Sequence, residues 1–194
     1  MKTIDHLLLG RYLLRSPNVQ MSKYEKKAFL FGCVEPDYNP LTRVKGTGPK
    51  DLFYGHNAEV AGRFIKRNLV KLNAMEQSSV YRCFMLGSLL HYLADAFTYV
   101  HNGSLFDGTL EEHCAYEMDL HNYLLDRLES RSVRMYSSTS VPLDAYFAEN
   151  HEEYRTKPQS VENDVEYITR VSAVALQCIL CSWKTVDFMQ PAFA

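Results

Sequence analysis

Two pairs of histidine and carboxylate residues in the middle of the chain have the spacing of metal ligands. His91 precedes Asp95 by four residues, and His113 precedes Glu117 by the same interval. Residues four apart on a helix project from one face, so one rigid helix can hold both ligands. Imidazole and carboxylate groups both bind zinc, at about 2.0–2.2 Å. The pattern therefore predicts a metal site, with His101 between the two pairs as a further ligand.

The surroundings of the first pair strengthen this interpretation. A single His and Asp pair on a helix is more often a surface pair or a hydrogen-bonded core histidine. This pair, however, lies in the apolar segment LLHYLADAF of residues 89–97. An ionised aspartate among such neighbours costs several kcal/mol unless it is paired or bound to a metal. Further candidates elsewhere in the chain are His6, Asp37 and His56.

Other catalytic and metal motifs do not fit this chain. Neither pair has the Glu-x-x-His spacing of di-iron bundles, and no His-Glu-x-x-His motif of zinc proteases occurs. The absence of an adjacent His-Asp dipeptide argues against an HD-type phosphohydrolase. Cys178 and Cys181 lie in an apolar segment without a second cysteine pair, which favours packing over a zinc or redox site. His121 is expected to support the site or lie at the surface, and His151 to be solvated.

The elements that must position these residues are predicted to be helices. Apolar periodicity and capping signals indicate helices over 3–14, 22–34, 57–73, 78–100, 110–129 and 161–188, and a short one over 143–153. An irregular segment over 35–55, rich in Pro and Gly, and a polar loop over 130–142 connect them. No convincing strand alternation occurs. The sequence therefore predicts an all-α fold, a single-domain multi-helix bundle of residues 1–194.

The composition of the 194-residue chain is that of a globular protein, with 46% apolar and 23% charged residues. Its net charge of −2 gives no global attraction to nucleic acid or an anionic membrane, although a local patch is not excluded. No stable nucleic-acid complex is expected. The chain has no run of 18 apolar residues, so no transmembrane helix is expected. No signal-peptide cleavage site follows the N-terminal segment. Five cysteines are most simply interpreted as reduced, buried thiols in a cytoplasmic protein.

The order of these candidate ligands resembles the zinc-dependent phospholipase C and S1/P1 nuclease superfamily, whose members are all-α. Residues 87–101, GSLLHYLADAFTYVH, resemble its G-x-x-x-H-x-x-x-D-x-x-x-P-x-H core, with Tyr99 where Pro is common. Glu35-Pro36-Asp37 resembles its Pro-Asp ligand turn, and His6 resembles its N-terminal histidine ligand. The matching order covers residues 1–117, about 60% of the chain, whereas residues 130–194 match nothing in particular.

The resemblance implies a site for up to three zinc ions. Many secreted members of the superfamily begin with a Trp exposed by processing, and Met1 departs from this pattern. The implied ligands are Asp37, His56 and His91 for the first ion; Asp95 as a bridge to the second, which would take His6 and the amino and carbonyl groups of Met1; and His101, His113 and Glu117 for the third.

The resemblance also implies a reaction. Clustered zinc ions would activate water and neutralise a phosphodiester, and Asp37 would orient or deprotonate that water. Tyr38 and Phe53 sit where phosphatidylcholine-cleaving members carry aromatic residues; they could bind a quaternary ammonium group or only pack the loop. The acidic residue of that pocket has no match.

Three functions remain open at this point. The first is a metal-dependent phosphodiester hydrolase of the phospholipase C type, acting on a phospholipid or another phosphodiester. The second is a single-strand nuclease or other phosphodiesterase with the same metal site, which would need aromatic platforms and a basic groove. The third is an inactive member that binds metal or a partner. The sequence leaves the head group and the oligomeric state open.

Overall fold

The computed structural model describes residues 1–39, 58–129, 136 and 139–184. The regular secondary structure within these residues is helical and includes no strand, which confirms the predicted all-α class. A short 3₁₀ helix, η1 (Tyr99–His101), lies between the fourth and fifth of the α-helices. The α-helices are α1 (Thr3–Leu13), α2 (Lys23–Tyr38), α4 (Ala58–Asn73), α5 (Val80–Ala96), α6 (Leu110–Glu129), α7 (Leu143–Thr156) and α8 (Val161–Lys184).

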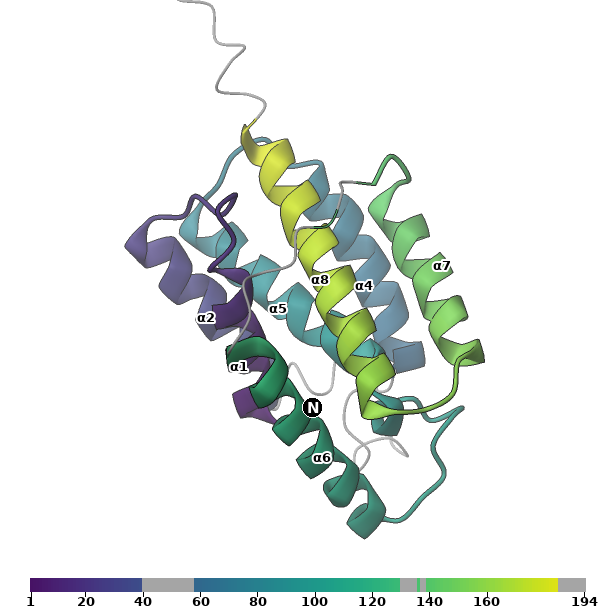
Figure 1. Ribbon diagram of the computed structural model, residues 1–194. Coiled ribbons are helices and arrows are strands. Elements are labelled where there is room, and N and C mark those ends of the chain that lie inside the picture. Colours follow the sequence, from purple (N-terminus) through teal and green to yellow (C-terminus); the bar gives the residue numbers. More distant parts are fainter. Residues whose placement is uncertain (40–57, 130–135, 137–138, 185–194) are drawn as a thin grey trace, which may run out of the picture.

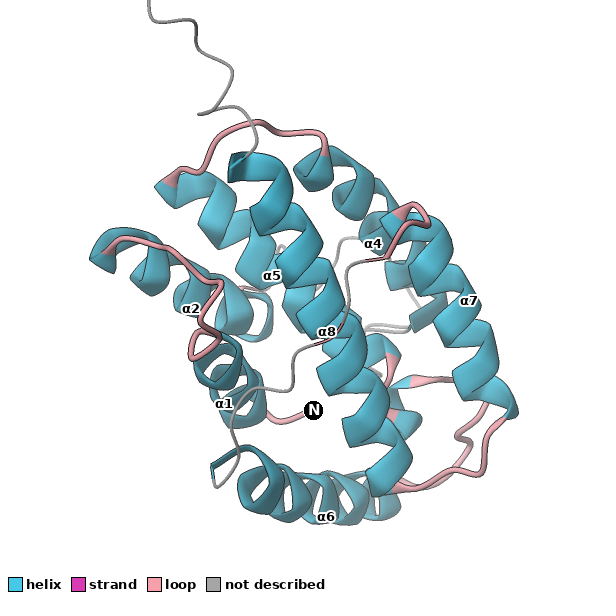
Figure 2. Ribbon diagram, turned by 45° about the horizontal axis from the view of Figure 1, so that its top comes forward, coloured by secondary structure: helices cyan, strands magenta, loops and turns pink. Residues whose placement is uncertain are grey.

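The helices surround α5, which carries the first pair of candidate ligands. Helix α5 packs against α1, α2, α4 and α8, and every residue from Leu89 to Ala96 is buried. Figure 1 shows α4, α7 and α8 on one side of α5 and α1 and α2 on the other, with α6 crossing below. The N-terminus lies between α1 and α6 in both views (Figures 1 and 2), and Met1 is buried. The fold therefore brings the chain start to the end of its central helix.

Helices α2 and α5 cross in direct backbone contact. A Cβ atom on Gly32 would lie 2.1 Å from the carbonyl oxygen of Phe84, and one on Gly87 would lie 2.0 Å from that of Phe29. Only glycine permits this approach at either position. The crossing places the next turn of α2 beside His91 in α5.

Helix α2 extends one turn beyond its predicted end. The prediction that Glu35-Pro36-Asp37 lies in an irregular turn after the helix is therefore wrong. These residues are helical and belong to the C-terminal end of α2. Pro36 removes one helix donor and its ring crowds the preceding turn, yet the helix continues, and its last turn closes through a bond from the Asn39 N–H to the Glu35 carbonyl at 3.0 Å. The start of the helix agrees with prediction, since Ser22 and Glu25 form the expected capping box.

The central helix is shorter than its predicted range of 78–100. Helix α5 ends at Ala96, and side chains then bond to its last carbonyl groups. The Thr98 hydroxyl donates to the carbonyl of Ala94 at 3.0 Å, and the Asn102 amide donates to that of Ala96 at 3.1 Å. Such local bonds compete with helix continuation. They set the 3₁₀ turn that carries His101.

Helix α8 is long and apolar enough to cross a membrane by length and composition alone, with a mean hydropathy of 1.3 over 18 residues. The helix was predicted, but the criterion of an uninterrupted apolar run did not select it as a membrane span, because charged and polar residues such as Glu166, Thr169 and Arg170 interrupt it. Of that stretch, 61% is buried inside the bundle, where α8 packs against α4, α5, α6 and α7. The core helix of a globular protein has the same properties, so α8 is weak support for a membrane span.

The cysteines are only partly buried. Cys33 and Cys83 are buried as predicted, but Cys114 and Cys181 are exposed. The prediction of buried thiols is therefore wrong for these two, because each lies on a solvent-facing position of its helix, α6 or α8.

Candidate metal centre

Asp95 lies at the centre of the candidate ligands and is buried. Its Oδ1 atom is 3.1 Å from the Met1 amino nitrogen, 3.3 Å from His6 Nε2 and 3.2 Å from His101 Nδ1. Its Oδ2 atom is 3.3 Å from His91 Nε2. One carboxylate therefore faces donors from the chain start, from α1, from α5 and from η1.

A second group of donors lies on the solvent side of Asp95 and is half-buried. Glu117 Oε1 is 3.2 Å from His101 Nε2, 3.6 Å from His113 Nε2 and 3.2 Å from the Met1 amino nitrogen. The Met1 amine is also 2.8 Å from His101 Nε2. Helix α6 supplies His113 and Glu117 from adjacent turns, as their spacing predicts. Met1 and His101 each lie close to both Asp95 and Glu117, and they therefore connect the two groups.

The ligands predicted from α2 and the segment after it are placed only in part. Asp37 is half-buried, with Oδ1 3.7 Å from His91 Nε2. Tyr38, the next residue, is exposed. His56 and Phe53 lie outside the described residues. The structure therefore brings Asp37 to the edge of the buried donors.

The spacing of the candidate ligand atoms is compatible with bound zinc, and several of these atoms have no hydrogen-bond partner among the described residues. Four ligands at about 2.1 Å around a tetrahedral zinc lie roughly 3.4 Å apart. The donor atoms of His6, His91 and Asp95 lie within 4.8 Å of one another, as do those of His101, His113 and Glu117. Both ring nitrogens of His6, Asp37 Oδ2 and Asp95 Oδ2 are buried without a hydrogen-bond partner in the part of the chain described. Buried polar atoms are rarely left in this state unless a water or an ion satisfies them.

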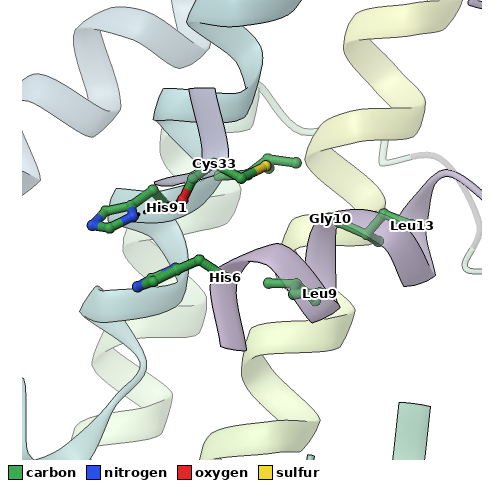
Figure 3. Close-up of a pocket in the computed structure, with 7 residues that line it drawn as sticks. His6, Leu9, Gly10, Leu13, Cys33 and His91 are labelled. Carbon is green, nitrogen blue, oxygen red and sulfur yellow. Dashed lines mark hydrogen bonds between the residues drawn. The ribbon is translucent and has the colours of Figure 1, made fainter. Parts of the chain in front are cut away.

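Two stacked imidazoles form the inner wall of the site. The rings of His6 and His91 are 3.7 Å apart between centroids and 19° from parallel (Figure 3). His91 Nδ1 lies 2.9 Å from the Cys33 carbonyl oxygen; since a carbonyl only accepts, Nδ1 carries the proton. The lone pair is then on Nε2, which faces Asp95. Metal-binding histidines commonly have this second hydrogen bond.

The electrostatics of the site favour ionised carboxylates and a neutral inner histidine. Burial alone would raise the pKa of Asp95. The Met1 ammonium and the nearby imidazoles outweigh this effect and hold the pKa well below its usual range. Burial and His91 lower the pKa of His6 to about 4, although Asp95 opposes this shift. At neutral pH His6 is therefore unprotonated, as a metal ligand must be.

Asp5, which was not among the predicted site residues, holds the chain start in place. Asp5 is fully buried in α1, and its Oδ2 accepts a bond from the Lys2 backbone N–H at 3.2 Å. Its Oδ1 lies 2.5 Å from His121 Nδ1 on α6. His121 thus supports the N-terminus through Asp5, in line with the expectation for it. The three-residue spacing of Lys2 and Asp5 is a helix-start signal that could have indicated this contact.

A second missed residue, Asp164, ties η1 to three helices. Asp164 Oδ2 accepts bonds from the Tyr99 N–H and the Tyr116 hydroxyl, each at 2.9 Å, and Oδ1 accepts one from the Tyr154 hydroxyl at 2.7 Å. Burial raises the pKa of Asp164 to about 6, although the three bonds oppose the rise. The available signal was that Asp164 precedes the buried Ile168 and Val171 by four and seven residues, so a carboxylate continues the apolar stripe of α8.

His151 is not solvated as predicted. It is half-buried in α7, with its ring 5.6 Å from the rings of both Phe97 and Phe147. Its Nε2 lies 3.3 Å from Asn102 Oδ1. The surrounding charged residues suggested solvent, but helical periodicity turns this position towards α5.

The fold and the donors define an all-α protein built around a candidate metal centre. A family model described as zinc dependent phospholipase C matches residues 5–171 of the chain. The protein belongs to this family of zinc-dependent phospholipases C, and the predicted resemblance is confirmed. The match extends past residue 130, so the expectation that the C-terminal segment matches nothing is wrong up to residue 171. No curated protein and no solved structure matches the chain.

Proposed function

We propose that this protein is a zinc-dependent phosphodiester hydrolase of the phospholipase C type. The observation that carries the proposal is Asp95, a buried carboxylate with donor groups on two sides in a member of this family. A structural role alone would not require so many imidazoles around one carboxylate, because two good hydrogen bonds would satisfy it.

The proposed centre binds up to three zinc ions. The separation into two groups of donors, joined by Asp95 and Met1, supports more than one ion. The proposed ligands are Asp37, His56 and His91 for the first ion, with Asp95 shared; His6 and Met1 for the second; and His101, His113 and Glu117 for the third. Zinc bound there would supply Lewis acidity and lower the pKa of a coordinated water to near ~7.

Asp37 is the proposed catalytic residue. Its side chain is less buried than that of Asp95, and its Oδ2 has no hydrogen-bond partner among the described residues. A carboxylate in this position can orient the attacking water and accept its proton. The phosphorus–oxygen bond to the leaving alcohol then breaks, and the products are a phosphomonoester and an alcohol.

The proposed substrate is a phospholipid. Tyr38 supports this choice, because its exposed ring follows Asp37 directly and can offer a π face to a quaternary ammonium group. Phe53 is proposed to complete that contact. With phosphatidylcholine the products would be phosphocholine and diacylglycerol.

Substrate assays with and without a chelator test the proposal. Zinc-loaded protein should hydrolyse phosphatidylcholine and a soluble chromogenic phosphodiester, and EDTA should abolish both reactions. Asp37→Asn should lower turnover at least ~100-fold, since it removes the proposed base. Asp119→Asn, at an exposed position of α6, is the matched control and should keep full activity. Turnover of single-stranded DNA alone would identify a nuclease, and bound zinc without turnover of any substrate would identify an inactive member.

A further inference from the structure

Helix α2 exposes three aromatic side chains on one face. Tyr24, Phe31 and Tyr38 follow one another at seven-residue intervals, and 72%, 58% and 72% of their surfaces are exposed. Seven residues are nearly two turns, so the three rings form a stripe about 21 Å long. The side of α2 that packs against α5 is formed by other residues, including Phe29 and Cys33. The core therefore does not account for the exposed rings.

Helix α5 widens this stripe. The ring of Phe84 lies 5.7 Å from that of Phe31, and Tyr81, one turn earlier, is 66% exposed. We call Tyr24, Phe31, Tyr38, Tyr81 and Phe84 the aromatic surface. Tyr rings suit the boundary between water and lipid because an apolar body ends in a polar hydroxyl, and Phe rings suit insertion below that boundary.

Three lysines lie at the N-terminal end of the aromatic surface, with Lys23 and Lys27 beside its stripe and Lys26 on the other side of α2. Lys23, Lys26 and Lys27 are all exposed in the first turns of α2. The one acidic residue among them, Glu25, is bonded to Ser22 and Ser78. Lysine at a helix N-terminus opposes the helix dipole, so helix stability does not explain this cluster. Near an anionic membrane such charges are attracted to the lipid head groups.

The far end of the aromatic surface meets the candidate metal centre. Tyr38 directly follows Asp37, whose Oδ1 is 3.7 Å from His91 Nε2. Contact of α2 with a bilayer would therefore bring the lipid head groups to the open edge of the site. The net charge of −2 does not reveal this local positive charge, because it sums over the whole chain.

From these observations we infer that the aromatic surface of α2 and α5 docks the protein on an anionic phospholipid membrane. The lysines bind the lipid phosphates and Phe31, Tyr24 and Tyr81 enter the interface. This inference rests on the proposed function, since it names the state in which the lipid substrate is met.

Vesicle binding by the zinc-loaded protein tests the inference. The bound fraction is measured by co-sedimentation with mixed phosphatidylcholine and phosphatidylserine vesicles, with and without added salt. The double variant Tyr24→Ser, Phe31→Ser should bind at least about fivefold less. Changing Lys23, Lys26 and Lys27 to Gln should weaken binding similarly and remove its salt dependence. The matched controls on α4, Val70→Ser and the triple change of Lys66, Arg67 and Lys71 to Gln, should bind like the unchanged protein.

Several results would overturn the docking surface. One is an absence of vesicle binding, and another is an equal loss of binding in the α4 controls. A third is that the α2 variants convert a dimer to a monomer in light scattering, because the face would then be a contact between two copies of the chain. A separate assay keeps the proposed function apart. The ratio of vesicle turnover to soluble-phosphodiester turnover should fall in the α2 variants. Vesicle binding without turnover of either substrate would contradict the proposed function and leave the docking surface supported.

Discussion

Asp95 Oδ1 lies 3.1 Å from the Met1 amino nitrogen, although 94 positions separate the two residues. Both groups are buried, and the same amine is 3.2 Å from Glu117 Oε1. The chain start therefore joins the inner donors to the outer ones. Burial lowers the pKa of this amine, but Asp95 and Glu117 raise it more. In the proposed function, zinc bound to the Met1 amine takes the place of the proton that Asp95 and Glu117 otherwise stabilise there.

Asp95→Asn is expected to release two zinc ions together. The proposed bridge needs both carboxylate oxygens, and an amide supplies only one, weaker oxygen ligand. Zinc content measured by plasma mass spectrometry should fall by two ions per chain. Asp119→Asn on α6 is the control and should retain all of its zinc. Loss of one ion or of none would contradict the bridging role.

Residues added before Met1 are expected to cost one zinc ion. An extension converts the Met1 amine into an amide, which neither carries a charge nor binds zinc at neutral pH. The zinc content of protein that begins at Met1 is compared with that of protein with a short N-terminal tag. The same tag placed after Ala194 is the control. Equal zinc content in the two proteins would remove Met1 from the ligand set.

Gly32→Ala is expected to destabilise the fold by at least about 2 kcal/mol. The new Cβ would meet the Phe84 carbonyl oxygen at 2.1 Å, so α2 and α5 must move apart. Urea unfolding measures the change. Gly62→Ala on α4 is the matched control, because its Cβ meets nothing within 4 Å and helix propensity alone should stabilise it slightly. Equal stability of both variants would show that the crossing tolerates a side chain.

Asp164→Asn is expected to change how stability depends on pH. The folded pKa of Asp164, about 6, exceeds its ordinary value of 3.8, so the folded state binds the proton more tightly than the unfolded state. This contribution is complete below the ordinary pKa and is lost as the pH rises through about 6. Unfolding of both proteins should show the wild-type advantage shrinking by up to ~2 kcal/mol between about pH 4.5 and about pH 7.5. An advantage that grows with pH would contradict this sign.

Helical periodicity predicted the α-helices in the described part of the chain, because each buries an apolar stripe that local sequence reveals. The ends were harder, since they depend on single contacts. Helix α2 continues for two residues past Pro36, although the proline removes a helix donor, and α5 stops where Thr98 and Asn102 take its carbonyl groups.

The candidate site was predictable where ligands share a helix and less so where they meet across the fold. The pairs in α5 and α6 follow from four-residue spacing. Asp5 and Asp164 each have one near partner, but their contacts with His121, Tyr99 and Tyr116 span more than 45 positions, and no local pattern reveals those. His151 was misjudged for the same reason, because its neighbours along the chain are polar while its neighbours in space are aromatic.

An anomalous-difference map at the zinc absorption edge tests the central claim most directly, on crystals of protein that begins at Met1 and has been supplied with zinc. We expect two or three zinc peaks, one within bonding distance of His6, His91 or Asp95 and another within bonding distance of His101, His113 and Glu117. A map without a peak at either group of donors would contradict the metal centre and the hydrolase function built on it.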